Sequence, residues 1–129
     1  MTHSETRTEN ILVSVQSQYI AERSQPEHYQ WFFTYTIRIT NEGDVGVQLI
    51  SRHWIITDGN GQVQEVRGAG VVGEQPSLEP GDHFEYTSIC PLETEFGTMQ
   101  GSYQMIDTDG KAFDADIAPF SFSVPNIVN

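Results

Sequence analysis

Three glycines, Gly68, Gly70 and Gly73, have the spacing G-x-G-x-x-G, which is the motif in this sequence with the best-defined chemistry. In dinucleotide-binding proteins this spacing opens a helix whose N-terminal N–H groups hold a pyrophosphate. The residues that follow here have no helical pattern, so the dinucleotide-fold interpretation fails on context. A glycine loop can still bind phosphate, pyrophosphate or a nucleotide through consecutive backbone N–H groups, and the neighbouring Arg67 would add positive charge. The structural alternative is that the glycines provide positive φ angles or close packing between sheets.

A cation, an imidazole and an indole stand side by side at Arg52, His53 and Trp54. On a strand, alternation sends Arg52 and Trp54 to one face and His53 to the other. Arg52 or His53 is therefore a candidate for the lining of a binding pocket. The structural alternative is that Trp54 packs in the core while Arg52 stacks or pairs at its rim.

Neither a catalytic centre nor a metal site is predicted from the spacing of the remaining polar residues. The four histidines lack ligand spacing, and the carboxylates at residues 107–116 are better explained by a hairpin turn and a solvated surface. The sequence contains no nucleophile elbow, and its one cysteine, Cys90, lies on the apolar side of its segment. We therefore expect no enzyme activity, no bound metal and no cofactor; a phosphoanhydride hydrolase is the last alternative.

Alternating hydrophobicity places these residues on strands. In residues 29–41 all six odd positions from 29 to 39 are apolar or aromatic, whereas five of the six even positions from 30 to 40 are polar. A period of two predicts a strand with one face in a core. The same period recurs in residues 11–19, 84–90, 99–105 and 113–117. The turn residues 58–61 (DGNG) predict a hairpin to a short polar strand over residues 62–66. The alternation changes parity within 45–57 and again near Pro119, which predicts a bulge or a change of sheet at each place.

Seven or eight strands without a convincing helix predict an all-β fold. The expected architecture is a two-sheet antiparallel sandwich of immunoglobulin or fibronectin type III character, with a small closed barrel as the alternative. Trp31, Trp54 and the phenylalanines are expected to fill the space between the sheets. Residues 1–10 are polar and are expected to form a flexible N-terminal tail, followed by a single domain over 11–129. A long glycine- and proline-containing connection is expected over 68–80.

Composition excludes several partners. The 129 residues contain 18 acidic and 6 basic side chains, for a net charge of −12. This charge repels phosphate backbones and anionic membranes, so we expect no nucleic-acid binding and no membrane insertion. The N-terminus has no apolar segment typical of a secretory signal, and the single thiol fits a reducing compartment, so the protein is expected to be cytoplasmic.

Several motifs together resemble the ApaG family. They are the segments 33–41 (FTYTIRITN), 48–54 (QLISRHW), 68–76 (GAGVVGEQP), 78–81 (LEPG), 84–88 (FEYTS) and 99–103 (MQGSY), together with Asp109-Gly110. They occur in the family's order from about residue 11 to residue 124, so the resemblance spans nearly the whole chain. The resemblance implies a fibronectin-like sandwich and an association with cobalt and magnesium resistance or efflux. Related domains occur in larger eukaryotic proteins, including an F-box protein and a DNA-polymerase-interacting protein, and no catalytic residues are implied.

Two functions from different classes follow. The first is a non-enzymatic binding module that presents loops and a sheet edge to an unidentified protein partner, with a homodimer as one form of such pairing. The second is a binder of small anions that uses Arg67, Gly68, Gly70 and Gly73. Direct binding of cobalt or magnesium by carboxylates is a third possibility for the family's association with metals.

Overall fold

The computed structural model describes residues 2–125, and most of them belong to strands. No described helix is long or apolar enough to cross a membrane. The two helical turns within the described residues are 3-10 turns of three residues each, η1 and η2. The elements in chain order are β1 (His3–Thr8), β2 (Ile11–Tyr19), η1 (Ala21–Arg23), η2 (Pro26–His28), β3 (Trp31–Asn41), β4 (Val47–Asp58), β5 (Val63–Ala69), β6 (Ser77–Leu78), β7 (His83–Leu92), β8 (Phe96–Asp107) and β9 (Ala112–Ser123).

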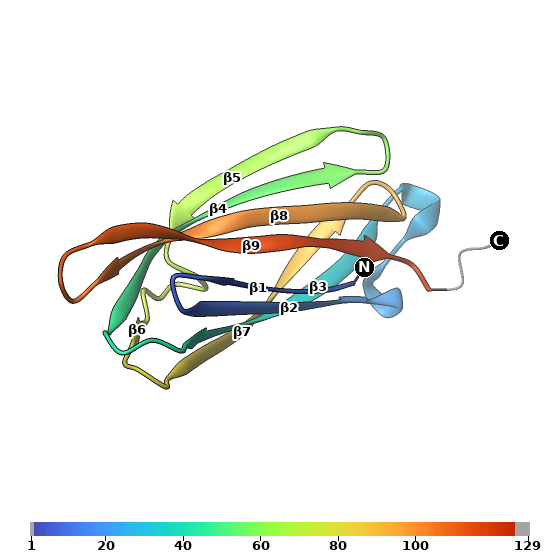
Figure 1. The fold of residues 1–129 in the computed structure, drawn as a ribbon. Coiled ribbons are helices and arrows are strands. Elements are labelled where there is room, and N and C mark those ends of the chain that lie inside the picture. The colour runs from blue at the N-terminus through green and yellow to red at the C-terminus, as the bar shows by residue number, and fades with distance from the viewer. Residues whose placement is uncertain (1, 126–129) are drawn as a thin grey trace.

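The strands form two antiparallel sheets that pack face to face, which confirms the predicted all-β sandwich (Figure 1). One sheet has the order β1-β2-β3-β7, and the other has the order β5-β4-β8-β9, with the short β6 paired to β4. In β3 the odd residues from Phe33 to Ile39 are buried between the sheets, as alternation predicts. The core therefore lies where the two apolar faces meet.

Both predicted changes of parity are bulges in the structure. The pairing of β4 with β8 shifts between Leu49 and Ser51, which leaves Ile50 at the bulge and 36% exposed. The pairing of β8 with β9 shifts opposite residues 118 and 119, where Pro119 could not donate a ladder hydrogen bond. After each bulge the apolar side chains return to the core, and Trp54 is 2% exposed. The bulges thus allow long strands to curve without losing their inward faces.

The predicted flexible tail is wrong for residues 3–8, which form β1. This strand pairs with β2 along its whole length, from His3 opposite Gln16 to Thr8 opposite Ile11. Alternating hydrophobicity does not reveal this strand because its sequence is polar. Its buried residue, Ser4, makes a hydrogen bond instead of packing as an apolar side chain. The Ser4 hydroxyl donates to the carbonyl of Ala118 at 2.9 Å. The last residues of the domain predicted for 11–129, residues 126–129, lie outside the described residues.

The predicted connection over residues 68–80 is also shorter than expected. Strand β5 continues through Ala69, so Gly68 lies within a strand, and β6 occupies two further residues. Trp54 fills the core as predicted, whereas Trp31 lies partly buried at its rim and Phe96 is 50% exposed. The aromatic side chains that are fully or almost fully buried between the sheets are Phe33, Trp54, Tyr103, Phe120 and Phe122.

The two sides of the sandwich differ. On one side β9 lies against β1 and β2, and side-chain hydrogen bonds join the sheets (Figure 1). The Ser17 hydroxyl donates to the carbonyl of Ser121 at 2.6 Å, beside the bond from Ser4. On the other side β5 and β7 are edge strands that do not pair with each other. Because this side is open, the fold is a sandwich and not the closed barrel that was the alternative. The candidate site lies on this open side.

Candidate functional site

A cleft of about 480 Å³ lies between β7 and the β4–β5 pair, on the open side of the sandwich. A second hollow of about 820 Å³, which we call the entrance groove, continues from it toward the β4–β5 turn. The two share Ile56, Gln64 and Pro91, so they form one path along the edge. Much of the cleft wall is apolar and includes Trp54, Ile56, Val66, Val71, Cys90 and Met99.

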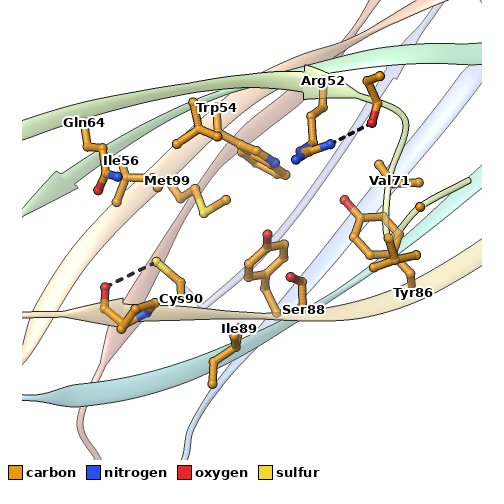
Figure 2. Close-up of a pocket in the computed structure, with 16 residues that line it drawn as sticks. Arg52, Trp54, Ile56, Gln64, Val71, Tyr86, Ser88, Ile89, Cys90 and Met99 are labelled. Atoms are coloured by element: carbon orange, nitrogen blue, oxygen red, sulfur yellow. Dashed lines mark hydrogen bonds between the residues drawn. The ribbon is translucent and has the colours of Figure 1, made fainter.

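Arg52 is the one charged residue among the described residues that line the cleft. Figure 2 shows its guanidinium pointing into the space between the sheets, above Tyr86 and beside Trp54. Its Nη1 donates to the carbonyl of Ala69 at 3.0 Å and to that of Gly70 at 2.8 Å. These two bonds fix the side chain, and its Nε and Nη2 groups donate no hydrogen bond to the described residues.

The Arg52 guanidinium differs from most other cations of the chain in having no carboxylate partner among the described residues. No Asp or Glu oxygen of the described residues lies within 4.0 Å of it. Four of the six basic side chains do have such a partner: Arg7, Arg38, Arg67 and Lys111. In a chain with 18 acidic side chains, Arg52 thus presents an uncompensated positive charge inside a partly apolar cleft.

Two tyrosines, Tyr35 and Tyr86, line the same cleft, and Tyr86 contacts the buried Tyr103. The hydroxyls of Tyr86 and Tyr103 lie 2.6 Å apart and share a hydrogen bond. Burial raises the pKa of both tyrosines, and burial raises the pKa of Tyr35 against a smaller opposing effect of a hydrogen bond with Ser88. The charge of Arg52 opposes this rise in pKa at each of the three tyrosines. The cleft therefore offers neutral hydroxyl groups beside one cation.

The motif glycines lie next to this arginine. Gly68 is the register partner of Arg52, and its lack of a side chain leaves space for the guanidinium. Gly70 has φ of 62°, and a Cβ there would overlap the carbonyl oxygen of Glu74. Gly73, with φ of 82°, lies in a turn closed by two hydrogen bonds of 2.8 Å between Val71 and Glu74. The backbone thus favours glycine at residues 70 and 73 whether or not an anion binds.

Anion binding by the 68–73 loop stays a prediction. The N–H of Gly70 donates to the carbonyl of Ile50, and the N–H groups of Val71 and Glu74 are used within the turn. Arg67, which was expected to add charge, lies on the outer face and is 70% exposed there. The cation beside this loop inside the cleft is Arg52, which lies on the opposite face of the same sheet from Arg67.

His53 and Arg67 come together on that outer face. His53 Nε2 lies 2.8 Å from a carboxylate oxygen of Glu65, and Arg67 lies 3.8 Å from the same oxygen. Alternation along β4 separates His53 from Arg52, as the sequence predicts. The structure thus joins Arg52 to Gly68 and Gly70, and it joins His53 to Arg67.

Sequence reasoning did not identify Tyr35, Tyr86 and Ser88 as site residues. The sequence does predict that Tyr86 and Ser88 lie on the inward face of one strand, because they alternate with outward residues up to Cys90. What the sequence lacked was the distance between β7 and β4, which belong to different sheets. Within residues 2–125, no three His, Cys, Asp or Glu side chains gather in a way that could hold a metal ion.

Comparison with known proteins identifies the family. The ApaG domain matches residues 21–107 of this chain. A protein named ApaG from Anaeromyxobacter dehalogenans is 54% identical over 122 residues, which cover 95% of this chain and 96% of that protein. The chain belongs to the ApaG family. A second ApaG protein, from Ectopseudomonas mendocina, is 55% identical over 119 residues and is covered to 94% of its length.

Solved structures agree with the ApaG assignment. The crystal structure of a protein described as ApaA from Bordetella pertussis has a TM-score of 0.86 and 51% identity, with 95% of each chain covered. The C-terminal domain of Wzt has a TM-score of 0.55 at 11% identity, over 98% of this chain and 80% of that one, which shows a shared fold alone. The ApaG sandwich of this chain is thus seen in a close relative, and its architecture extends to distant proteins.

Proposed function

We propose that this ApaG-family protein is a non-enzymatic binding module that takes an extended segment of another protein into the open side of its sandwich. The observation that carries the proposal is the continuous path formed by the cleft and the entrance groove between the unpaired edges of β5 and β7. Unpaired strand edges supply backbone donors and acceptors for an added strand, and alternating pockets receive its side chains.

Two large apolar side chains at the entrance groove are mostly exposed to solvent. Tyr29 is 71% exposed and Val63 is 65% exposed, and both line this groove. Exposed apolar groups gathered along a concave surface are typical of protein interaction sites. The acidic field of the whole chain, −12, would favour a partner with basic segments and speed its capture.

We infer that this encounter takes place in the cytoplasm, in line with the single cysteine. On this proposal, the association of the family with cobalt or magnesium resistance would act through the bound partner and not through an ion on this chain. A homodimer built through the same edges is the competing form of the interaction.

Site-specific photo-crosslinking in cells tests the proposal. A photoreactive phenylalanine analogue replaces Val63 in the entrance groove, and in a matched control it replaces Ile106, which is 36% exposed on β8, away from the groove. The expected result is a discrete adduct at position 63, identified by mass spectrometry, that is absent at position 106. Equal adducts at both positions, or none at position 63, would contradict the proposal. An adduct of twice the chain mass would identify a second copy as the occupant.

A further inference from the structure

The chain that leaves β5 crosses one end of the path between β5 and β7, which we call the closed end. Arg52 and Tyr86 lie at that end, and the chain leaving β5 crosses from one sheet toward the other beside them (Figures 1 and 2). Ala69, Val71 and Gly73 of this crossing line the cleft. The other end opens through the entrance groove. We take this crossing as the end of the path, at which an extended chain entering through the entrance groove would reach Arg52.

The closed end has the chemistry of a carboxylate site. Nη1 of Arg52 is held by two backbone carbonyls, and the rest of the guanidinium has no carboxylate partner among the described residues. A fixed planar guanidinium binds carboxylates with high directional preference. The single cation, the apolar walls and the net charge of −12 disfavour ligands with several negative charges, such as nucleotides.

The open end has the opposite charge. Asp58 and Glu93 line the entrance groove together with the apolar side chains of Tyr29 and Val63. From Arg52 to Asp58 the path follows β4 over six residue-to-residue steps, a length of about 20 Å at the rise of a strand. This length accommodates about six extended residues. Positively charged side chains upstream of a terminal carboxylate would meet the two acidic side chains.

We propose that the cleft and entrance groove bind the carboxy-terminal segment of a partner protein. The terminal carboxylate lies on Arg52, the apolar last residue lies between Trp54 and Cys90, and upstream Lys or Arg side chains lie over Asp58 and Glu93. This inference rests on the proposed function, because it names the part of the partner that the same path receives. An internal acidic side chain is the competing source of the carboxylate, and the closed end of the path disfavours it.

The test uses two synthetic hexapeptide libraries, acetylated and randomised at all six positions, one with free carboxy termini and one with carboxy-terminal amides. Purified full-length protein is expected to enrich free-acid peptides with an apolar last residue and with Lys or Arg two to four positions upstream. The most enriched peptide is then titrated by NMR as free acid and as amide. Its affinity is expected to fall about tenfold or more on amidation, since the guanidinium loses a charged acceptor.

Two arginine variants provide matched controls. Arg52→Met and Arg67→Met remove the same charge from adjacent strands, but only Arg52 lies in the cleft. We expect the free-acid peptide to lose about tenfold in affinity with Arg52→Met and less than about twofold with Arg67→Met, because an exposed charge contributes little. Glu93→Gln is expected to reduce the preference for basic upstream residues.

The results that overturn the proposal are equally specific. Equal enrichment from the acid and amide libraries, or no enriched free-acid peptide, would overturn it even if Arg52→Met failed to fold. Enrichment of an internal Asp or Glu in the amide library would assign the carboxylate to a side chain and would also overturn it. A position-specific adduct at Val63 in the crosslinking experiment, together with any of these results, would leave the proposed function standing and reject its carboxy-terminal form.

Discussion

The guanidinium of Arg52 faces the Cα of Gly68 on the neighbouring strand, and a Cβ on Gly68 would lie 2.8 Å from Nη2 and 2.9 Å from Cζ. The two residues are register partners in the pairing of β4 with β5. The first glycine of the G-x-G-x-x-G motif therefore creates the space in which the cation of the cleft lies. This gives the glycine a role in positioning a side chain, in place of the phosphate contact that the motif suggests.

Gly68→Ala is expected to displace Arg52 without unfolding the protein. The conflicting atoms belong to the end of a flexible side chain, so the free energy of unfolding should change by less than about 1 kcal/mol. The Nε–H resonance of Arg52 should shift in a two-dimensional NMR spectrum, and affinity for the peptide of the preceding test should fall. An unchanged Arg52 resonance would show that Gly68 does not position it.

Gly70→Ala is expected to destabilise the fold by about 2 to 4 kcal/mol. The positive φ of 62° is strained for alanine, and its Cβ would overlap the Glu74 carbonyl oxygen, which is backbone and cannot move away cheaply. Gly73→Ala is the control, since its φ of 82° is also positive but no atom lies within 4 Å of a Cβ there. Urea denaturation should give a loss of about 1 kcal/mol for the control. Equal losses for the two variants would contradict the overlap at residue 70.

The hydroxyl pair of Tyr86 and Tyr103, 2.6 Å apart, is expected to show strong coupling. Tyr86→Phe leaves the fully buried Tyr103 hydroxyl without its partner, which should cost about 1 to 3 kcal/mol of unfolding free energy. The double variant Tyr86→Phe with Tyr103→Phe removes both polar groups and should be less destabilised than the sum of the single variants. Denaturation of the four proteins of this cycle measures the coupling, and additive losses would refute it.

Alkaline pH is expected to destabilise the protein through its buried acids. Burial raises the pKa of the Cys90 thiol to about 12, whereas the unfolded thiol ionises near 9.0. The stabilisation from the neutral thiol is therefore complete below pH 9 and is lost as the pH rises from 9 to 12, by about 1.4 kcal/mol for each pH unit. The raised pKa values of Tyr35, Tyr86 and Tyr103 act in the same direction above pH 10.

Cys90→Ala separates the thiol from the tyrosines in this pH dependence. Urea midpoints at pH 8, 9 and 10 should fall more slowly for Cys90→Ala than for the wild type, although the variant is less stable at pH 8 because of its cavity. Parallel pH profiles for the two proteins would mean that the thiol does not contribute.

Deletion of residues 2–8 is expected to destabilise the whole sandwich. The deletion removes β1, its ladder with β2 and the hydrogen bond from Ser4 to Ala118. It also exposes the edge of β2 and the side of β9 that lies against β1. Thermal denaturation should show a fall of several degrees or more in Tm, and Ser4→Ala alone should give a smaller fall. An unchanged Tm after the deletion would support the flexible tail instead.

Much of the fold could be predicted from alternation. Residues 11–19 were predicted as a strand and form β2 with those bounds, because one face of the segment is buried and the other is not. The bulges near Ile50 and Pro119 could be predicted because a change of parity must be absorbed in the ladder. Strand β1 could not, since its one buried residue, Ser4, is held by a hydrogen bond to a carbonyl 114 positions away.

For the candidate site, the sequence determined which side chains share a face: Arg52 with Trp54, and Tyr86 with Ser88 and Cys90. It determined this because strand periodicity is a local property of the backbone. Only the tertiary structure decided that these two faces meet across an open edge, that Arg52 has no carboxylate partner among the described residues, and that Arg67 lies outside. Such facts depend on how two sheets are positioned by contacts between residues far apart in the chain, and no short-range pattern encodes that distance.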